Sequence, residues 1–130
     1  LTQLMPATAR EMAGRLRLEE PDITDPATNL RIGGYYLQRL RARFTDVVPA
    51  LLAYNAGPTR VRRWTAGFGD LPGLLFTEAV PFVETRNYLR KVLVSASYYS
   101  YLYGNSSMSD TVQLFFPDLE SEGGQQTPSL

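Results

Sequence analysis

The chain has 130 residues, of which 44% are hydrophobic and 20% are charged, and its formal net charge is zero. This length and composition are typical of a single globular domain. The chain has no Cys and no His, which excludes disulfides, thiolate nucleophiles, Ser-His-Asp triads and the commonest zinc ligands. Any chemistry must therefore rest on carboxylates, hydroxyls, amides and tyrosines.

The distribution of charged and apolar residues gives no support to two further classes of protein, nucleic-acid binders and membrane-spanning proteins. All 13 basic residues lie before residue 105, but the resulting excess of positive charge is too small to indicate nucleic-acid binding. No apolar run approaches the roughly 20 residues that a membrane-spanning helix needs, so no membrane span is predicted. The first residue is Leu, not Met, and we interpret the chain as a piece of a longer protein.

The first part of the chain predicts two helices. Pro6 opens a helix over residues 6–18, and Asp25 followed by Pro26 is typical of the start of a second helix over residues 26–44. Because Gly is costly inside a helix, we expect Gly33 to lie under a neighbouring helix. The expected core stripe of the second helix is Leu30, Gly33, Leu37, Leu40 and Phe44.

The central stretch predicts a corner between two helices. An apolar run over residues 47–53 indicates a short buried helix, with Tyr54 and Asn55 on its last turn. Gly57 ends that helix and Pro58 suits the first turn of the next, which is expected over residues 59–65 and is followed by a loop. A phenol and a carboxamide held at such a corner suit a polar ligand such as a sugar. The same spacing also fits a half-buried core tyrosine and a capping asparagine.

The second half predicts one short and one long helix. Residues 74–80 are expected to be helical, and Thr85 is expected to cap a helix over residues 86–103. Beyond this helix we expect an irregular tail over residues 105–130, with one extended segment at residues 111–116. The prediction is an all-α fold of about six helices, with a domain at residues 1–104. The side chains expected to face inward from the long helix are Leu89, Val92, Leu93, Ala96, Tyr99 and Tyr103.

Glu84 and Tyr88 are candidate site residues, because positions four apart share one face of a helix. The alternative for Glu84 is a structural role at the helix start, where the helix dipole favours a carboxylate. Glu78 and Glu84 are also a candidate pair of glycosidase carboxylates, although the sequence does not fix their separation. We see no acidic metal cluster and expect no metal and no cofactor. The basic run from Arg60 to Arg63 is interpreted as a solvated face.

Three motifs in order resemble the C-terminal catalytic domain of soluble lytic transglycosylases, the goose-lysozyme-like family that cleaves peptidoglycan. Residues 1–9, Leu-Thr-Gln-Leu-Met-Pro-Ala-Thr-Ala, resemble the family's Gly-Leu-Met-Gln-Leu-Met-Pro-x-Thr-Ala block. Residues 53–57 match its Ala-Tyr-Asn-Ala-Gly block, and residues 80–88 resemble its Ile-Pro-Phe-x-Glu-Thr-Arg-x-Tyr block. The resemblance spans residues 1–104.

This resemblance implies a lysozyme-like helical domain that acts on the β-1,4 bond between N-acetylmuramic acid and N-acetylglucosamine in the periplasm or cell envelope. In the family, one Glu protonates the leaving oxygen and then takes the proton of the muramic 6-hydroxyl, which gives a 1,6-anhydro product. That Glu belongs to a Glu-Ser motif upstream of the first block, so we expect it to precede Leu1. Substrate-binding roles carry over to Gln3, Met5, Tyr54, Asn55, Glu84 and Tyr88.

The alternative function is a non-catalytic module that grips glycan strands without cutting them. A Glu-Ser pair some 20 residues before Leu1 would separate the enzyme from the binder. A helical nucleic-acid binder that uses Arg60 to Arg63 is a weaker alternative, which would require a steeply salt-dependent affinity for DNA.

Overall fold

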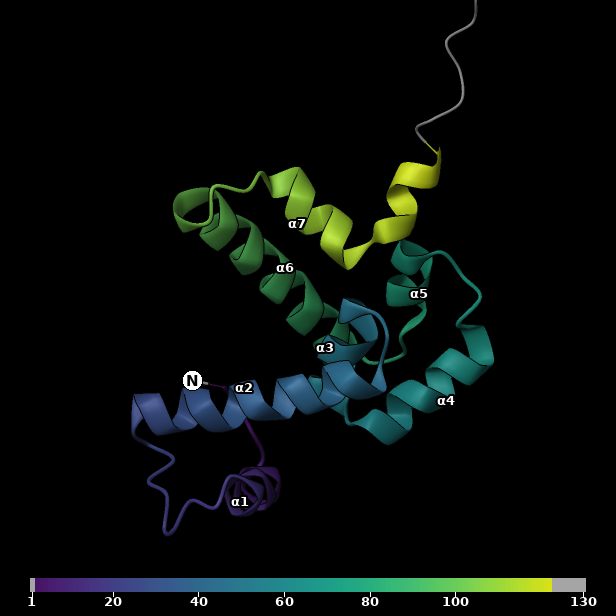
Figure 1. The fold of residues 1–130 in the computed structure, drawn as a ribbon. Helices are drawn as coiled ribbons and strands as arrows, with labels where there is room; N and C mark the ends of the chain where they lie inside the picture. Colours follow the sequence, from purple (N-terminus) through teal and green to yellow (C-terminus); the bar gives the residue numbers. More distant parts are fainter. Residues whose placement is uncertain (1, 123–130) are drawn as a thin grey trace, which may run out of the picture.

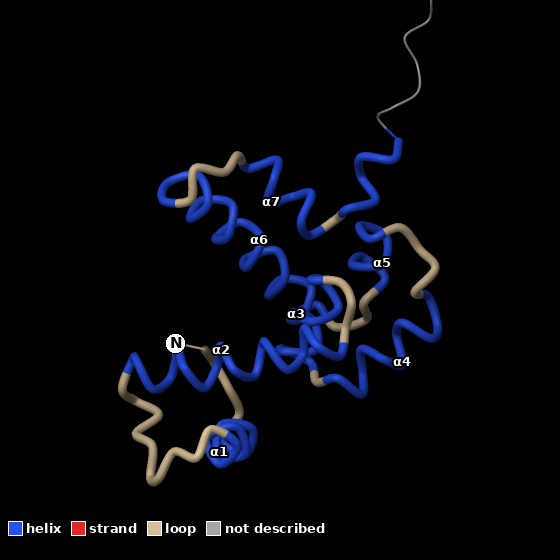
Figure 2. Tube along the Cα trace, viewed as in Figure 1, coloured by secondary structure: helices blue, strands red, loops and turns tan. Residues whose placement is uncertain are grey.

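The fold is entirely helical in the part of the chain that the structure, a computed structural model, describes, which is residues 2–122. These residues form seven α-helices and one 3-10 helix, with no strand among them (Figure 2). The all-α prediction is therefore confirmed. In chain order (Figure 1) the elements are α1 (Pro6–Arg15), α2 (Pro26–Arg43), α3 (Val47–Ala56), α4 (Pro58–Phe68), α5 (Gly73–Ala79), α6 (Val83–Tyr103), α7 (Met108–Phe115) and η1 (Pro117–Glu122).

Most of the predicted helix starts are found. Pro occupies the first turn of α1, α2 and α4, where its missing N–H breaks no intrahelical hydrogen bond. The carboxylate of Asp25 accepts a hydrogen bond from the backbone N–H of Thr28 at 2.9 Å, which satisfies one of the free donors at the start of α2. Gly57 has a φ of 90°, a value that side chains disfavour, and it joins α3 to α4. Helix α4 continues to Phe68, three residues further than predicted.

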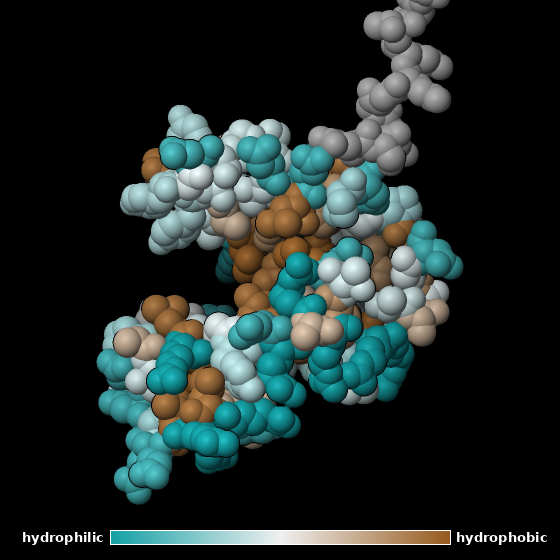
Figure 3. Space-filling view, in the orientation of Figure 1, coloured by the Kyte–Doolittle hydropathy of each residue, from teal (hydrophilic) through white to brown (hydrophobic). Residues whose placement is uncertain are grey.

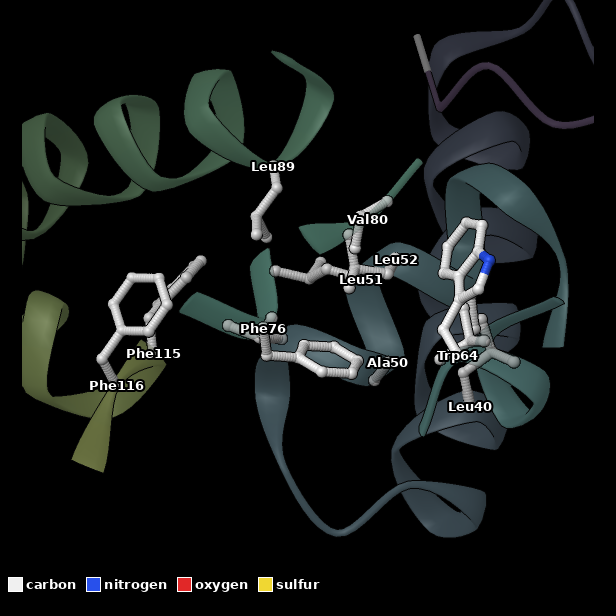
Figure 4. Packing of buried hydrophobic residues seen from close by; sticks show 13 residues of the cluster. Leu40, Ala50, Leu51, Leu52, Trp64, Phe76, Val80, Leu89, Phe115 and Phe116 are labelled. Atoms are coloured by element: carbon white, nitrogen blue, oxygen red, sulfur yellow. The ribbon is translucent and has the colours of Figure 1, made fainter. Parts of the chain in front are cut away.

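Helix α3 is the centre of the main core. It contacts α2, α4, α6 and α7, and Ala50, Leu52 and Ala53 are fully buried. A helix that is apolar on all sides is stable only when neighbours surround it, and this is the arrangement here. Figure 4 shows Trp64 of α4 and Leu89 of α6 among the side chains that pack around it.

A second, smaller cluster joins α1 to α2. Its buried residues are Ala9, Met12, Ala13 and Ile32. Leu30, which was expected in the core stripe of α2, is 58% exposed, so that expectation is wrong. The residue of α2 that is buried against α1 is Ile32, which lies two positions further on and so on nearly the opposite side of the helix.

Gly33 is buried under the N-terminal segment, not under a helix as expected. A Cβ atom at this position would lie 2.6 Å from Cβ of Thr2 and 2.9 Å from its Oγ1. Thr2 is fixed there because its backbone N–H and its hydroxyl both donate to Oδ1 of Asn29, each at 2.9 Å. The close approach of an extended segment therefore explains the glycine.

Two expectations for α6 are wrong. Thr85 does not cap the helix, which begins at Val83 after Phe82, and it is instead a buried residue of the first turn. Tyr99 and Tyr103, which were expected to face inward, are 67% and 79% exposed. Helix α6 contacts α3 and α7, and its buried residues are Thr85 and Leu89, both in its first half.

The C-terminal part is more ordered than the sequence predicted. The expected extended segment at residues 111–116 lies mostly in α7, which begins with a capping box between Ser107 and Asp110. Phe115 and Phe116 are buried in the main core. The expectation of an irregular tail is therefore wrong for residues 108–122, while residues 123–130 lie outside the described part.

The space-filling view shows a hollow between two arms of the molecule (Figure 3). One arm is formed by α1 and α2 and the other by α6 and α7, and apolar side chains gather at the base of the hollow between them. None of the helices in the described residues is both long enough and apolar enough to cross a bilayer.

Candidate functional site

The predicted site residues come together in one cleft. Its volume is about 570 Å³, and it lies between the N-terminal segment, α2, the end of α3 and the starts of α4 and α6. All six residues that the resemblance assigned to substrate binding line it, although they come from three separate stretches of the chain. The lining residues are Gln3, Leu4, Met5, Thr8, Tyr36, Tyr54, Asn55, Ala56, Gly57, Arg60, Glu84 and Tyr88.

Tyr54 contacts several of the residues that form one wall of the cleft. Its hydroxyl donates a hydrogen bond to the backbone carbonyl of Thr2 at 2.9 Å, which ties the N-terminal segment to the end of α3. Its ring is parallel to that of Tyr88, with centroids 6.5 Å apart, and tilted against that of Tyr36 at 5.3 Å. Three tyrosines from α2, α3 and α6 thus line the cleft side by side.

These tyrosines keep their protons at neutral pH. Burial raises the pKa of Tyr88 to about 12, with a further contribution from the neighbouring Tyr54. Burial also raises the pKa of Tyr54 and of Tyr36 above the ordinary value. Their phenols are therefore neutral groups that can donate and accept hydrogen bonds, as a sugar-binding wall requires.

Asn55 connects the two helices that carry the other polar groups. Its Oδ1 accepts a hydrogen bond from the hydroxyl of Thr85 at 2.8 Å, and Thr85 is only 2% exposed. This bond joins the last turn of α3 to the first turn of α6, next to Glu84. Asn55 thus ties α3 to α6 at the corner, and its side-chain amide can also donate hydrogen bonds to a ligand in the cleft that it lines.

Glu84 lies at the cleft and Glu78 does not. Glu84 is exposed in the first turn of α6, where the helix dipole favours its negative charge. Glu78 forms an ion pair with Arg90, with an Oε1–Nη2 distance of 2.6 Å. Glu84 is the single carboxylate among the residues that line the cleft in the described part of the chain. The sequence hypothesis of a Glu78–Glu84 carboxylate pair therefore has no support from the geometry.

Gln3 and Met5 stand on the opposite, N-terminal side of the cleft. Both are exposed, and Met5 is 72% exposed although it precedes a helix with a buried face. Gln3 has a φ of 53°, a left-handed conformation that is uncommon for a residue with a side chain. The anchors at Thr2 hold this unusual backbone in place on α2 and α3.

Three polar residues of the cleft, Thr8, Tyr36 and Arg60, were not predicted. Tyr36 was not singled out, although it follows Gly33 by three positions on α2 and so shares the side over which the N-terminal segment lies. Arg60 was interpreted as part of a solvated basic face. Its place in the first turn of α4, directly after the Gly57–Pro58 corner, was the signal that could have separated it from Arg62 and Arg63.

Arg86, by contrast, has a structural role. Its Nη1 donates to the carbonyl of Val80 at 2.6 Å across the Pro81 break. No group of three or more acidic side chains within residues 2–122 is placed to hold a metal ion.

Comparisons with known proteins agree with the motifs. The sequence model of the family described as the transglycosylase SLT domain matches residues 1–75. The soluble lytic murein transglycosylase of Escherichia coli K12 is 37% identical over 111 residues, which are 81% of this chain and 17% of that protein. The protein of the same name from Salmonella typhimurium LT2 is 36% identical over 119 residues, 85% of this chain and 18% of that protein.

The fold agrees as well. The crystal structure of the 70 kDa soluble lytic transglycosylase from Escherichia coli matches with a TM-score of 0.72 and 36% identity, over 78% of this chain and 18% of that one. The chain thus spans less than a fifth of the length of the relatives that it matches. The ordered motifs, the family match and the shared helical fold all lead to one assignment. The chain belongs to the transglycosylase SLT domain family.

Proposed function

We propose that this chain forms the substrate cleft of a peptidoglycan lytic transglycosylase, which cleaves the β-1,4 bond between N-acetylmuramic acid and N-acetylglucosamine. The observation that carries the proposal is the convergence of all six expected binding residues, from three separate stretches, on one cleft. Neutral tyrosines, a carboxamide and a carboxylate line it, and these groups suit the hydroxyl and acetamido groups of a glycan strand.

The cleft favours a scheme with one acid rather than two carboxylates. In the proposed reaction, a carboxylic acid protonates the leaving glycosidic oxygen, and the resulting carboxylate takes the proton of the muramic 6-hydroxyl as that oxygen bonds to the anomeric carbon. The proton balance closes without water, and the product carries a 1,6-anhydro ring. This scheme needs no second carboxylate in the position that Glu78 was considered for.

We propose that the acid comes from a segment that precedes Leu1, and that Glu84 binds substrate. Glu84 is exposed, whereas a carboxyl group that donates a proton at neutral pH is usually shielded from water. Its place beside Tyr88 and Asn55 suits contact with the muramic sugar and its 6-hydroxyl. Gln3 and Met5 line the cleft within a few residues of Leu1, and Tyr54 holds this stretch through the carbonyl of Thr2.

The proposed partner is therefore the glycan strand of peptidoglycan, and the proposed location is the periplasm or cell envelope, where that polymer lies. No nucleic-acid role is proposed, because the formal net charge of the chain is zero and Arg60, one of the arginines considered for such a role, belongs to the cleft.

Binding to insoluble peptidoglycan tests this function. Residues 1–130 are mixed with purified sacculi, which are then sedimented, and the retained protein is measured. We expect the chain to be retained and Glu84→Gln to weaken retention. Glu78→Gln is the matched control and should leave retention unchanged, because Glu78 is paired with Arg90 outside the cleft. Failure of the unaltered chain to sediment, or equal losses in the two variants, would contradict the proposal.

A further inference from the structure

The cleft continues into a second pocket at the corner between α3, α4 and α6. This pocket has a volume of about 430 Å³ and shares Asn55, Ala56, Arg60 and Glu84 with the cleft. A glycan strand that lies in the cleft can therefore place a substituent there. Its remaining lining residues are Pro81, Phe82, Val83 and Thr85.

Arg60 is held at the junction of the two pockets. Its Nη1 donates to the carbonyl of Ala56 at 3.2 Å, and its guanidinium carbon lies 5.0 Å from the centroid of the Phe82 ring. Trp64 in turn packs edge-on against Phe82, with centroids 5.5 Å apart and an interplanar angle of 83°. The guanidinium group is thus supported by α3 on one side and by the exposed ring of Phe82, which packs on buried Trp64, on the other.

The contacts with Ala56 and Phe82 hold the guanidinium group in place, but they do not neutralise its charge. Arg60 lies in the first turn of α4, where the helix dipole disfavours a positive charge. The ion pairs within residues 2–122 are Arg15–Glu11 and Arg90–Glu78, and neither involves Arg60. One of its five N–H donors meets Ala56, which leaves donors for a planar anion that reaches the pocket.

We infer that Arg60 binds a carboxylate of the substrate strand and makes the cleft selective for muramic-acid-containing glycan over neutral chitin-like glycan. The inference rests on the proposed function. N-acetylglucosamine carries no charge, whereas a murein strand presents a carboxylate either on the lactyl group of a peptide-free muramic acid or on its stem peptide. A guanidinium fork matches either carboxylate in a bidentate geometry.

Three ligands of equal sugar length test the inference by titration calorimetry with residues 1–130. They are a chitin oligosaccharide, a peptide-free murein oligosaccharide and one that carries stem peptides. We expect at least one of the murein ligands to bind about tenfold more tightly than the chitin oligosaccharide, as one charge-assisted hydrogen-bonded contact allows. Arg60→Gln should remove that difference, and Arg60→Lys should restore only part of it. Arg62→Gln is the matched control, because Arg62 is exposed on the same helix and lines neither pocket.

The outcomes separate the two claims. Preference for the peptide-free ligand assigns the lactyl carboxylate, and preference for the peptide-bearing ligand assigns the stem peptide. Equal binding of all three ligands, or an unchanged preference in Arg60→Gln, would overturn the inference and leave the glycan-binding function standing. No binding of any ligand would overturn the proposed function itself.

Discussion

Tyr54 has a structural role at the residue scale that its motif does not reveal. The resemblance assigns Tyr54 to substrate binding, and that assignment stays a prediction. Within the described residues, the hydroxyl donates to the carbonyl of Thr2 and so holds the segment that carries Gln3 and Met5. This hydrogen bond thereby fixes the N-terminal side of the cleft to the end of α3.

Tyr54→Phe should therefore loosen the N-terminal segment. The Thr2 carbonyl loses its partner, and we expect the free energy of unfolding to fall by about 1 kcal/mol. Hydrogen exchange should rise at the backbone amides of residues 4 and 5. Tyr101→Phe serves as the control, because Tyr101 is 64% exposed on the far half of α6. Identical exchange in both variants would show that the hydroxyl does not hold this segment.

Tyr88 should make stability depend on pH in the alkaline range. Its pKa is about 12 in the folded protein, against an ordinary value of 10. Between these values the folded state retains a proton that the unfolded state has lost, so stability is full below pH 10 and falls as the pH rises toward 12. Chemical denaturation at a series of pH values should show a shallower fall for Tyr88→Phe than for the unaltered chain. Parallel curves would argue against a buried phenol.

At the scale of elements, the sequence predicted what local chemistry determines. Pro6, Asp25–Pro26 and the Gly57–Pro58 corner begin or end helices as expected, because proline, capping and glycine rules act over a few residues. The errors at Leu30, Tyr99 and Tyr103 have another cause. Periodicity identifies a helix face, but which part of that face is covered depends on where distant elements dock.

The candidate site also combines residues that local motifs predict with residues whose roles depend on distant contacts. The motifs brought Tyr54, Asn55, Glu84 and Tyr88 to attention, and the fold does place them together. Arg60 escaped notice because its neighbours are also arginines, and its separate role follows only from its contacts with Ala56 and Phe82. The role of Thr85 was likewise misjudged, because its partner Asn55 is 30 positions away.

Gly33 and Gly34 are adjacent glycines in α2 with opposite expected responses to substitution. Gly33→Leu should lower the free energy of unfolding by roughly 1–3 kcal/mol, because Thr2 occupies the space that a side chain would need. Gly34→Ala should raise it by roughly 0.5–1 kcal/mol, because no atom lies within 4 Å of its Cβ position and alanine favours the helix. Urea denaturation measures both. Equal effects would show that Thr2 does not pack on α2.

At the scale of the whole molecule, the C-terminal helices complete the core that supports the cleft. Phe115 and Phe116 are buried against the cluster built on α3, and the carboxylate of Asp118 accepts a hydrogen bond from the Gly73 N–H at 2.7 Å, at the start of α5. A unit that ended at residue 104 would expose this part of the core. The expected division after residue 104 is therefore not a division of the hydrophobic core.

Removal of one buried ring should show this dependence. Phe116 is 2% exposed, and Phe116→Ala should cost about 3–5 kcal/mol of unfolding free energy, as other buried aromatic truncations do. Leu114 lies two positions earlier and is 62% exposed, so Leu114→Ala should change stability by less than about 0.5 kcal/mol. Thermal or chemical denaturation of both variants measures these changes in the free energy of unfolding. A small effect of Phe116→Ala would mean that this C-terminal part is not needed for the core.

The central claim is that this cleft binds peptidoglycan for cleavage by an acid that a segment preceding Leu1 supplies. The most direct test incubates purified sacculi with residues 1–130 and, separately, with a protein that also carries the preceding segment, and identifies released muropeptides by mass spectrometry. The account predicts 1,6-anhydro-muropeptides from the longer protein and none from residues 1–130 alone. Anhydro-muropeptides from residues 1–130 would contradict it, because Glu84 would then supply the acid, and no product from either protein would favour a glycan-binding module without catalysis.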